Sequence, residues 1–375
     1  MTGNDFVYRR FIEWLATAWA GLPKSPYRLE AIRAFYAPAE AELLTGIPFS
    51  ARSIDDLAAM KEMKPEDLAP MLDALARRGG VWRGVKGETV YYRLNDAFFT
   101  FTRSAFWPER PDERARASVR PFNKYFYDGF MDPFSHSNTK GLRTIPIRRT
   151  IKDPRRIPSY EDVLQFVDAQ DYFVVACCPC RQRKNLDPDA PDCPHPVEVC
   201  LHFGRLAHYM VDNGLGREIT RGETKEILTL SAESGLVHAI SNWQKTPDTI
   251  CNCCRCCCVF FEAFHVLGHD KSHDPSNYRV HVRAETCRAC GLCVDRCPVD
   301  ALSLKASPAA SGGERKAVFL SEPDRCLGCG VCVYKCPTGS LSLERREETC
   351  DPPADPGEWM KRWVEDTKTA GGREA

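Results

Sequence analysis

The sequence predicts a multidomain α+β protein. Apolar residues recur at helical spacing through the first hundred positions, eleven cysteines gather between residues 172 and 270, and eight more form two short strand–loop units near the C-terminus. At 375 residues the chain has room for two or three domains. We expect a helical domain at 1–102, a strap at 103–160, a mostly helical cysteine-rich domain at 161–275, a two-loop domain at 276–346 and a tail at 347–375.

Residues 1–102 have the pattern of several helices followed by a hairpin. Ser53 and Asp56 fit a capping box that opens a short helix, and Pro65 begins a longer one. Strand-like runs then flank a turn at Lys86-Gly87-Glu88. The expected helices lie at 6–20, 30–36, 38–44, 54–60 and 65–78, and the expected strands at 81–85 and 89–94. This arrangement resembles a winged helix-turn-helix.

The winged-helix-like region lacks the charge pattern of a DNA reader. Its second helix begins Pro65-Glu66-Asp67, and acidic residues at the leading end would oppose phosphate. Residues 51–100 balance eight basic against eight acidic side chains. The basic edge is small and consists of Arg77, Arg78, Arg83 and Lys86. We therefore expect a docking module, and DNA is not an expected partner.

Residues 103–156 form a basic stretch that is rich in aromatic residues and prolines. It holds thirteen Lys or Arg against six Asp or Glu. One interpretation is an extended strap that packs its rings on the body and leaves its arginines in water. The other is a docking surface for an acidic redox partner or a nucleic-acid backbone. The aromatic residues are Phe106, Trp107, Phe122, Tyr125, Phe126, Tyr127 and Phe130.

The middle cysteines fall into three groups. The first is Cys177-Cys178-Pro179-Cys180, the second is Cys193 with Cys200, and the third is the run from Cys251 to Cys258. No ordinary core needs six cysteines in eight residues, so we expect metal here. On an extended chain the even-numbered cysteines of the run would share one face and the odd-numbered ones the other.

We expect one or two additional iron–sulfur clusters in this block, with zinc as the lesser alternative. The candidate ligands are Cys178, Cys180, Cys193, Cys200, Cys251, Cys253, Cys254, Cys256, Cys257 and Cys258. His195 is a candidate non-thiolate ligand, although its place between two prolines also suits a turn. Arg181 and Arg255 would place positive charge beside anionic clusters and raise their reduction potentials.

Two identical cysteine runs mark the C-terminal domain. They are Cys287-x-x-Cys290-x-x-Cys293-x-x-x-Cys297-Pro298 and Cys326-x-x-Cys329-x-x-Cys332-x-x-x-Cys336-Pro337. This spacing is typical of proteins that hold a pair of cubane iron–sulfur clusters. Zinc motifs seldom use it, and disulfides do not suit a reducing compartment. Strand-like segments flank each run, and an insertion at 306–313 has the composition of a flexible loop.

Residues 278–345 closely resemble the bacterial-type dicluster ferredoxins. The resemblance implies two [4Fe-4S] clusters with crossed ligands. Cluster I would take Cys287, Cys290, Cys293 and Cys336, and cluster II would take Cys326, Cys329, Cys332 and Cys297. Gly291 and Gly330, each one residue after the second cysteine of a run, would let the backbone approach the sulfurs.

Most of the chain resembles a family of cysteine-rich iron–sulfur proteins of anaerobic bacteria. In that family a Cys-x-Cys-Arg motif and a Cys-Asn-Cys-Cys-x-Cys-Cys-Cys run precede a dicluster ferredoxin domain, as Cys178 and Cys251 begin such motifs here. The resemblance implies additional metal in the middle domain and no particular activity.

The bulk properties indicate a globular cytoplasmic protein. The N-terminus lacks the basic and apolar regions of a signal peptide, and no apolar stretch has the length of a membrane span. The formal net charge is zero. Twenty cysteines without an export signal indicate metal binding in a reducing, oxygen-poor cytoplasm.

These features predict an iron–sulfur protein that passes single electrons to or from a partner redox enzyme. The first alternative is an iron–sulfur oxidoreductase with its active site in the middle domain. The second is a redox-sensing regulator that acts through the winged helix. No Walker loop and no strand-led Gly-x-Gly-x-x-Gly is present, so neither a hydrolase nor a nucleotide enzyme is expected.

Overall fold

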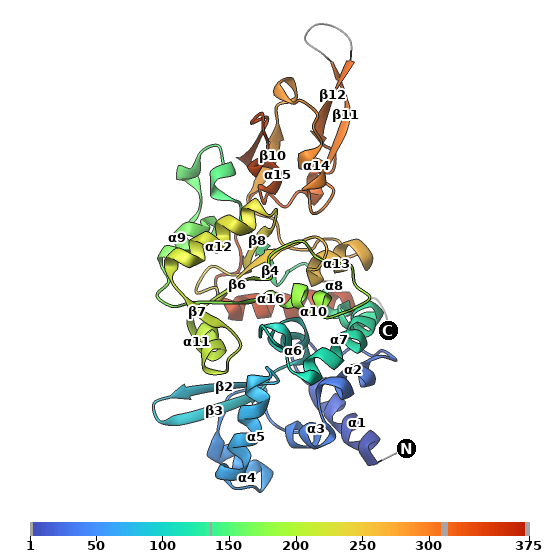
Figure 1. The fold of residues 1–375 in the computed structure, drawn as a ribbon, viewed down its shortest axis with the longest axis vertical. Coiled ribbons are helices and arrows are strands. Elements are labelled where there is room, and N and C mark those ends of the chain that lie inside the picture. The colour runs from blue at the N-terminus through green and yellow to red at the C-terminus, as the bar shows by residue number, and fades with distance from the viewer. Residues whose placement is uncertain (1–2, 136, 309–313, 372–375) are drawn as a thin grey trace. The chain divides into compact units, whose positions relative to one another are not determined.

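The computed structural model describes residues 3–135, 137–308 and 314–371 (Figure 1). The chain forms two compact units. The first unit comprises Met1–His136, Val174–Cys193 and Arg205–Glu218, and the second comprises Ser137–Phe173, Pro194–Gly204 and Ile219–Ala375. Each unit therefore draws on three separate stretches of sequence.

The first unit is largely helical. Its core consists of aromatic rings, of which Phe35 and Phe101 lie edge to face with centroids 5.4 Å apart, and Phe101 stacks on Phe122 at 5.0 Å. Its helices are α1 (Gly3–Leu15), α2 (Arg28–Phe35), α3 (Pro38–Leu44), α4 (Ile54–Lys61), α5 (Pro65–Arg77), α6 (Ala97–Thr102), α7 (Glu113–Tyr125), α8 (Asp132–Ser135), α10 (Pro179–Asn185) and α11 (Gly204–Asp212). Strands β5 (Phe173–Cys177) and β7 (Arg217–Ile219) are neighbours in its sheet.

The helix and hairpin boundaries predicted for residues 38–94 are confirmed. Ser53 Oγ accepts a hydrogen bond from the Asp56 N–H at 3.1 Å and so caps α4. A three-stranded sheet follows in the order β1-β3-β2, built from β1 (Arg52–Ser53), β2 (Val81–Lys86) and β3 (Thr89–Leu94). The assignment of this arrangement to the winged-helix class stays a prediction.

Two members of the predicted basic edge are neutralised within the first unit. Arg78 pairs with Glu40 at 2.7 Å, and Arg83 pairs with Asp73 at 2.9 Å. The Tyr92 hydroxyl also donates to Asp73. These contacts hold the hairpin against α5 and withdraw two charges from the surface that would meet a phosphate backbone.

The basic stretch after residue 102 is not an extended strap. It forms α7, a π-type turn η2 (Phe126–Phe130) and several 3₁₀ turns. Of its aromatic residues Tyr127 is 41% exposed, and the other six are buried. Burial of these rings makes the segment part of a core, and a helix satisfies the backbone groups that such burial removes from water. The 3₁₀ turns are η1 (Ser104–Phe106), η3 (Arg148–Thr150), η4 (Pro154–Arg156) and η5 (Ser159–Glu161).

The second unit contains four consecutive strands of one sheet, in the order β4-β8-β9-β6. These are β4 (Leu142–Thr144), β6 (Glu198–Phe203), β8 (Val237–Ser241) and β9 (Thr249–Cys253). Strands β8 and β9 are antiparallel, and Ala239 lies opposite Cys251. Its middle helices are α9 (Val163–Asp168), α12 (Arg221–Glu233) and α13 (Val259–Val266). Thr220 and Glu223 form a capping box at the start of α12, and both of its hydrogen bonds are present.

The expectation of a mostly helical middle domain was wrong. Residues 161–275 alternate five helices with five strands. The apolar run at residues 172–176 does indicate β5, but strands β6, β8 and β9 are short and carry buried polar residues, such as His202, His238 and Asn252, which interrupt the apolar run of a buried strand. Cys253 lies at the end of β9, so part of the cysteine block belongs to the sheet.

Two antiparallel strand pairs flank the cysteine loops. Strand β10 (Tyr278–Val282) pairs with β13 (Leu341–Arg345), and β11 (Leu302–Pro308) pairs with β12 (Glu314–Leu320) (Figure 1). Between them lie the short helices α14 (Leu292–Asp295) and α15 (Val331–Tyr334) and the turns η6 (Ala284–Thr286) and η7 (Pro323–Arg325). Residues 306–308 of the predicted loop belong to β11, and residues 309–313 lie outside the described part of the chain.

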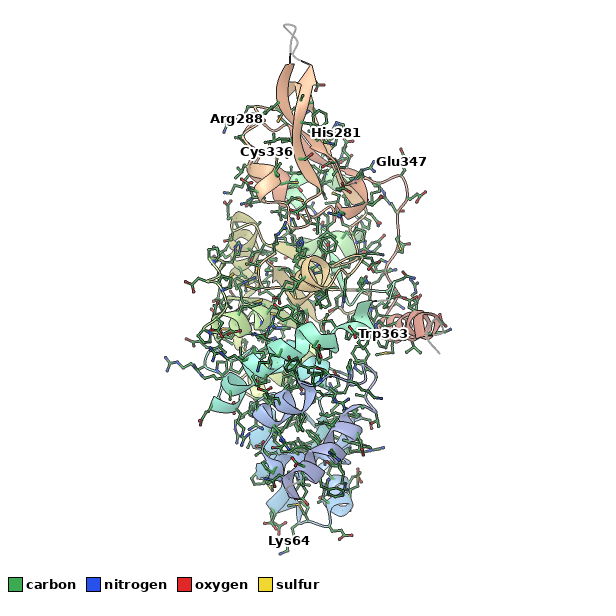
Figure 2. The ribbon with its side chains drawn as sticks, turned by 90° about the vertical axis from the view of Figure 1, so that its right-hand side faces the viewer. Lys64, His281, Arg288, Cys336, Glu347 and Trp363 are labelled. Carbon is green, nitrogen blue, oxygen red and sulfur yellow. The ribbon has the colours of Figure 1, made fainter. Side chains whose placement is uncertain are left out.

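The C-terminal tail contains one helix, α16 (Pro356–Gly371). Trp359 and Trp363 are buried, and Figure 2 labels Trp363 on this helix. The Trp359 indole donates to the Lys140 carbonyl at 3.0 Å. The tail therefore packs on the second unit through its tryptophans. Among the described residues, no helix is both long and apolar enough to cross a membrane.

Candidate metal centres

The two cysteine loops repeat each other in backbone conformation. Three positions in each loop have positive φ, between 54° and 81°. Glycine adopts this left-handed conformation freely, and other residues adopt it at a cost. The paired positions are Ala289 and Gly328, Gly291 and Gly330, and Asp300 and Gly339.

Each loop closes around a hollow lined by four cysteines. One hollow is lined by Cys287, Cys290, Cys293 and Cys336. The other is lined by Cys297, Cys326, Cys329 and Cys332. Each hollow thus combines the first three cysteines of one run with the fourth of the other. Figure 2 shows Cys336 in this region together with Arg288, which lines the same hollow.

In each hollow a backbone N–H donates to one of the lining thiols. The Ala301 N–H donates to Cys297 Sγ at 3.2 Å, and the Ala289 N–H donates to Cys287 Sγ at 3.4 Å. Such bonds stabilise a thiolate and raise the reduction potential of a cluster bound through it. At Cys336 burial acts to raise the pKa, but hydrogen bonds from the Thr338 side chain and from nearby N–H groups outweigh it and lower the pKa.

The most buried thiols need a cation to ionise. Burial raises the pKa of Cys329 to about 12 and that of Cys293 to about 11. A thiol that binds a metal ion loses its proton to the ion's charge. These residues therefore fit a positively charged iron centre better than they fit isolated thiolates.

The structure gives a different reason for Gly291 and Gly330 from the approach to the sulfurs that the sequence predicted. A Cβ on Gly330 would lie 2.3 Å from Thr150 Oγ1, and the atom nearest to a Cβ on Gly291 would be Leu304 Cδ1 at 3.8 Å. Neither close atom is a sulfur. Positive φ requires glycine at both positions, and close approach of Thr150 adds a second reason at Gly330.

The comparison with known families supports the same region. Residues 286–340 match the 4Fe-4S dicluster domain family. Such a domain implies iron–sulfur electron transfer, and this match also accounts for the cysteine spacing. No curated protein and no solved structure matches the chain. We call residues 278–345 the dicluster region.

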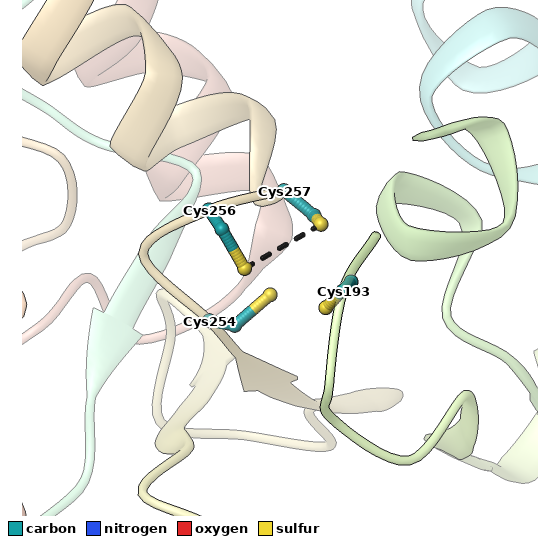
Figure 3. A group of neighbouring side chains, drawn as sticks. All are labelled: Cys193, Cys254, Cys256 and Cys257. Atoms are coloured by element: carbon teal, nitrogen blue, oxygen red, sulfur yellow. Dashed lines mark hydrogen bonds between the residues drawn. The ribbon is translucent and has the colours of Figure 1, made fainter. Parts of the chain in front are cut away.

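Three cysteines of the central run form a second kind of site. Cys254, Cys256 and Cys257 bring their sulfurs within 4.8 Å of one another, and the Cys257 thiol donates to Cys256 Sγ at 3.6 Å. Figure 3 shows these three side chains; Cys193, which it also labels, is the last residue of a segment of the first unit. Hydrogen bonding to Cys254 and Cys256 raises the pKa of Cys257.

Two further thiols of the run form a separate group with a histidine. Cys253, Cys258 and His273 place one ligand atom each within 4.8 Å of the other two. No sequence motif marks His273 as a ligand, because it lies in a loop fifteen residues after Cys258, the last cysteine of the run. Only its burial, at 0% exposed, distinguishes it from a surface histidine.

The predicted division of the run into even and odd faces was wrong. The extended conformation ends at Cys253, and residues 255–257 form a turn. The turn brings Cys257 beside Cys254 and Cys256, and returns Cys258 to Cys253. Alternation of faces holds only while the backbone stays extended.

Four other candidate cysteines belong to neither group among the described residues, and one of them, Cys251, lies on β9 two residues before Cys253. Cys178 precedes the first residue of α10, Cys180 lies in its first turn, and Cys200 is buried in β6. His195 lies outside helix and strand, as the flanking prolines favour. Among the described residues, the structure thus forms two compact groups from the central candidates and does not include Cys178, Cys180, Cys200, Cys251 and His195 in them.

The central run contacts the dicluster region directly within the second unit. The Arg255 guanidinium pairs with Asp300 at 2.8 Å and reaches the Cys297 carbonyl at 3.5 Å. His265 of α13 lies 2.7 Å from the Pro298 carbonyl. Cys253 and Cys258 also share one apolar core with Cys297 and Cys329. The two cysteine-rich segments are therefore packed against each other.

Proposed function

We propose that this protein passes single electrons through two [4Fe-4S] clusters to or from a partner redox protein. The observation that carries the proposal is the composition of the two hollows, each lined by three cysteines of one run and the fourth of the other. Bound there, the clusters would supply one-electron carriers. The chain's own residues hold them, donate N–H groups to the sulfurs and keep the inner thiols from water.

The proposed ligand sets follow the lining of the hollows. Cluster I is held by Cys287, Cys290, Cys293 and Cys336, and cluster II by Cys326, Cys329, Cys332 and Cys297. Neither set gathers its sulfurs as closely as the two central groups do within the described chain. In a cubane each thiolate binds a different iron, so this wider spacing favours clusters over single ions.

We propose that the group around Cys256 holds a further metal centre at the edge of the same path. Thiolate sulfurs around one tetrahedral ion lie roughly 3.8 Å apart, given metal–sulfur bonds of about 2.3 Å. The 3.6 Å between Cys256 Sγ and Cys257 Sγ agrees with this spacing. A single iron held by the thiolates of this group is therefore favoured over the third cubane that the sequence suggested.

The contact through Arg255 supports a role for this centre in electron transfer. Arg255 lies between Cys254 and Cys256 in the sequence and reaches the backbone of Cys297, a proposed ligand of cluster II. The central run would then be the point at which electrons enter or leave cluster II.

A set of single Cys→Ser variants tests the proposal. Loss of Cys329 or Cys293 should remove up to about four irons with their acid-labile sulfide, whereas loss of Cys256 should remove about one iron and no sulfide. Cys350, which is exposed and outside every run, supplies the matched control. Iron retained in full by the Cys293 and Cys329 variants would contradict the assignment.

The two alternative functions stay predictions with simple tests. An oxidoreductase needs an iron open to exogenous ligands, so cyanide would change its spectrum. A regulator would shift duplex DNA in a manner sensitive to salt and redox state.

A further inference from the structure

A group of ligand-type side chains in the second unit has no part in the proposed electron path. Cys253 and Cys258 place their sulfurs, and His273 one ring nitrogen, within 4.8 Å of one another. All three residues are buried. Cys253 ends β9, Cys258 directly precedes α13, and His273 lies in the segment after α13. Three separate pieces of backbone therefore converge on this point.

The histidine presents a nitrogen that its surroundings leave unused. His273 Nδ1 lies 3.1 Å from Ser272 Oγ, whereas Nε2 is buried and has no hydrogen-bond partner among the described residues. The rings of Phe260 and Phe261, with centroids 5.6 and 4.8 Å from the imidazole, cover it. A buried polar nitrogen without a partner is costly, and a metal ion would supply one. Metal-binding histidines commonly fix the other ring nitrogen with a hydrogen bond, as Ser272 does here.

A fourth donor lies on the same strand. Cys251 and Cys253 share one face of β9, because alternate residues of a strand point the same way. Hydrogen bonding links the thiol of Cys253 with those of both Cys251 and Cys258, and Cys251 also acts electrostatically on His273. The group therefore contains three sulfurs and one imidazole.

We propose that Cys251, Cys253, Cys258 and His273 bind one zinc ion in a closed structural site. Three thiolates and one imidazole form a ligand set typical of structural zinc, and the 4.8 Å limit on the spacing of the Cys253, Cys258 and His273 donors suits one tetrahedral ion. Zinc is not redox-active, so this site stands or falls independently of the proposed electron transfer.

The zinc would fix the segment that contacts the dicluster region. It would join the end of β9 to the start of α13, and α13 carries Phe264 and His265. The Arg325 guanidinium lies over the Phe264 ring at 5.9 Å, and His265 contacts the Pro298 carbonyl. The ion would thus stabilise the packing of the central run on the loops that hold the clusters.

Metal analysis of the full-length protein, purified without oxygen, tests the site. We expect His273→Ala to lose one zinc per chain relative to the wild type, with iron unchanged. His273→Cys should retain the zinc, since it keeps four donors. The matched control is His238→Gln, which alters another buried histidine beside the same strand, held by Asn252 at 2.6 Å. This variant should keep its full zinc content.

A second measurement needs no variant and so does not depend on folding of a mutant. Zinc X-ray absorption of the wild type should show mixed sulfur and imidazole scattering. Equal zinc in the wild type and His273→Ala would overturn the proposal, as would a shell of sulfur alone. Loss of iron in place of zinc in His273→Ala would also overturn it. A protein that lacks the dicluster iron but keeps this zinc would contradict the proposed function alone.

Discussion

Arg255 forms a bidentate ion pair with Asp300. The guanidinium comes from the turn of the central cysteine run, and the carboxylate lies three residues after Cys297. The hydrogen bond to Arg255 is the largest of the effects that together lower the pKa of Asp300. Both side chains are about half exposed, so the pair contributes little to stability, roughly 0–1 kcal/mol. Its consequence lies in the charge that it places beside the Cys297 loop.

Arg255→Ala should lower the reduction potential of the cluster bound through Cys297. Removal of a positive charge, with Asp300 left unpaired, disfavours the added electron by on the order of tens of millivolts. Arg255→Lys keeps the charge and should shift the potential little. Asp300→Asn should shift it the other way. Redox titrations followed by EPR would reveal these shifts, and potentials unaffected by all three changes would refute the role assigned to Arg255.

Pairs of ligand substitutions should show which cysteines share a cluster. Cys297 and Cys329 line one hollow, whereas Cys293 lines the other. We expect Cys297→Ser with Cys329→Ser to remove up to about four irons, no more than either change alone. Cys297→Ser with Cys293→Ser should remove up to about eight. Iron content decides between these outcomes, and additive loss in the first pair would show that the ligands are not crossed as proposed.

Gly330→Ala should be more destabilising than Gly291→Ala. Both positions have φ near +80°, so each substitution costs about 1 kcal/mol in backbone strain. Only at Gly330 would the new Cβ clash with another atom, Thr150 Oγ1, which would lie 2.3 Å away. Urea unfolding of the two variants would measure the difference. Equal midpoints would contradict this prediction, because they would show that η3, which contains Thr150, makes room for the new Cβ without loss of stability.

The sequence predicted the parts of this protein that depend on local rules. Cysteine spacing located the dicluster loops, and the capping residue Ser53 located the start of a helix. What it missed depends on tertiary context. The turn at residues 255–257 regrouped the central thiols, and His273 joined them from a distant loop. The strands of the middle segment were hidden because burial on both faces, with buried histidines and asparagines, removes the alternation that marks a strand.

Stability should fall on mild acidification because of His238. Burial lowers the pKa of His238 from 6.5 to about 4, so between these values the unfolded chain binds a proton that the native protein does not. The contribution is therefore complete above pH 6.5 and declines toward pH 4, by about 1.4 kcal/mol per pH unit. Between pH 7 and pH 5.5 the urea midpoint should fall further in the wild type than in His238→Gln. The same acid sensitivity in both proteins would rule out His238 as its source.

Anaerobic quantitation of iron and acid-labile sulfide, combined with EPR of the reduced protein, tests the central claim most directly. Two [4Fe-4S] clusters predict about eight sulfides per chain and two interacting one-electron signals, and a single thiolate-bound iron adds about one iron without sulfide. A content of about twelve sulfides per chain would show that the central site holds a third cubane and not a single iron. Four or fewer sulfides, with one isolated signal, would contradict the assignment of a cluster to each hollow.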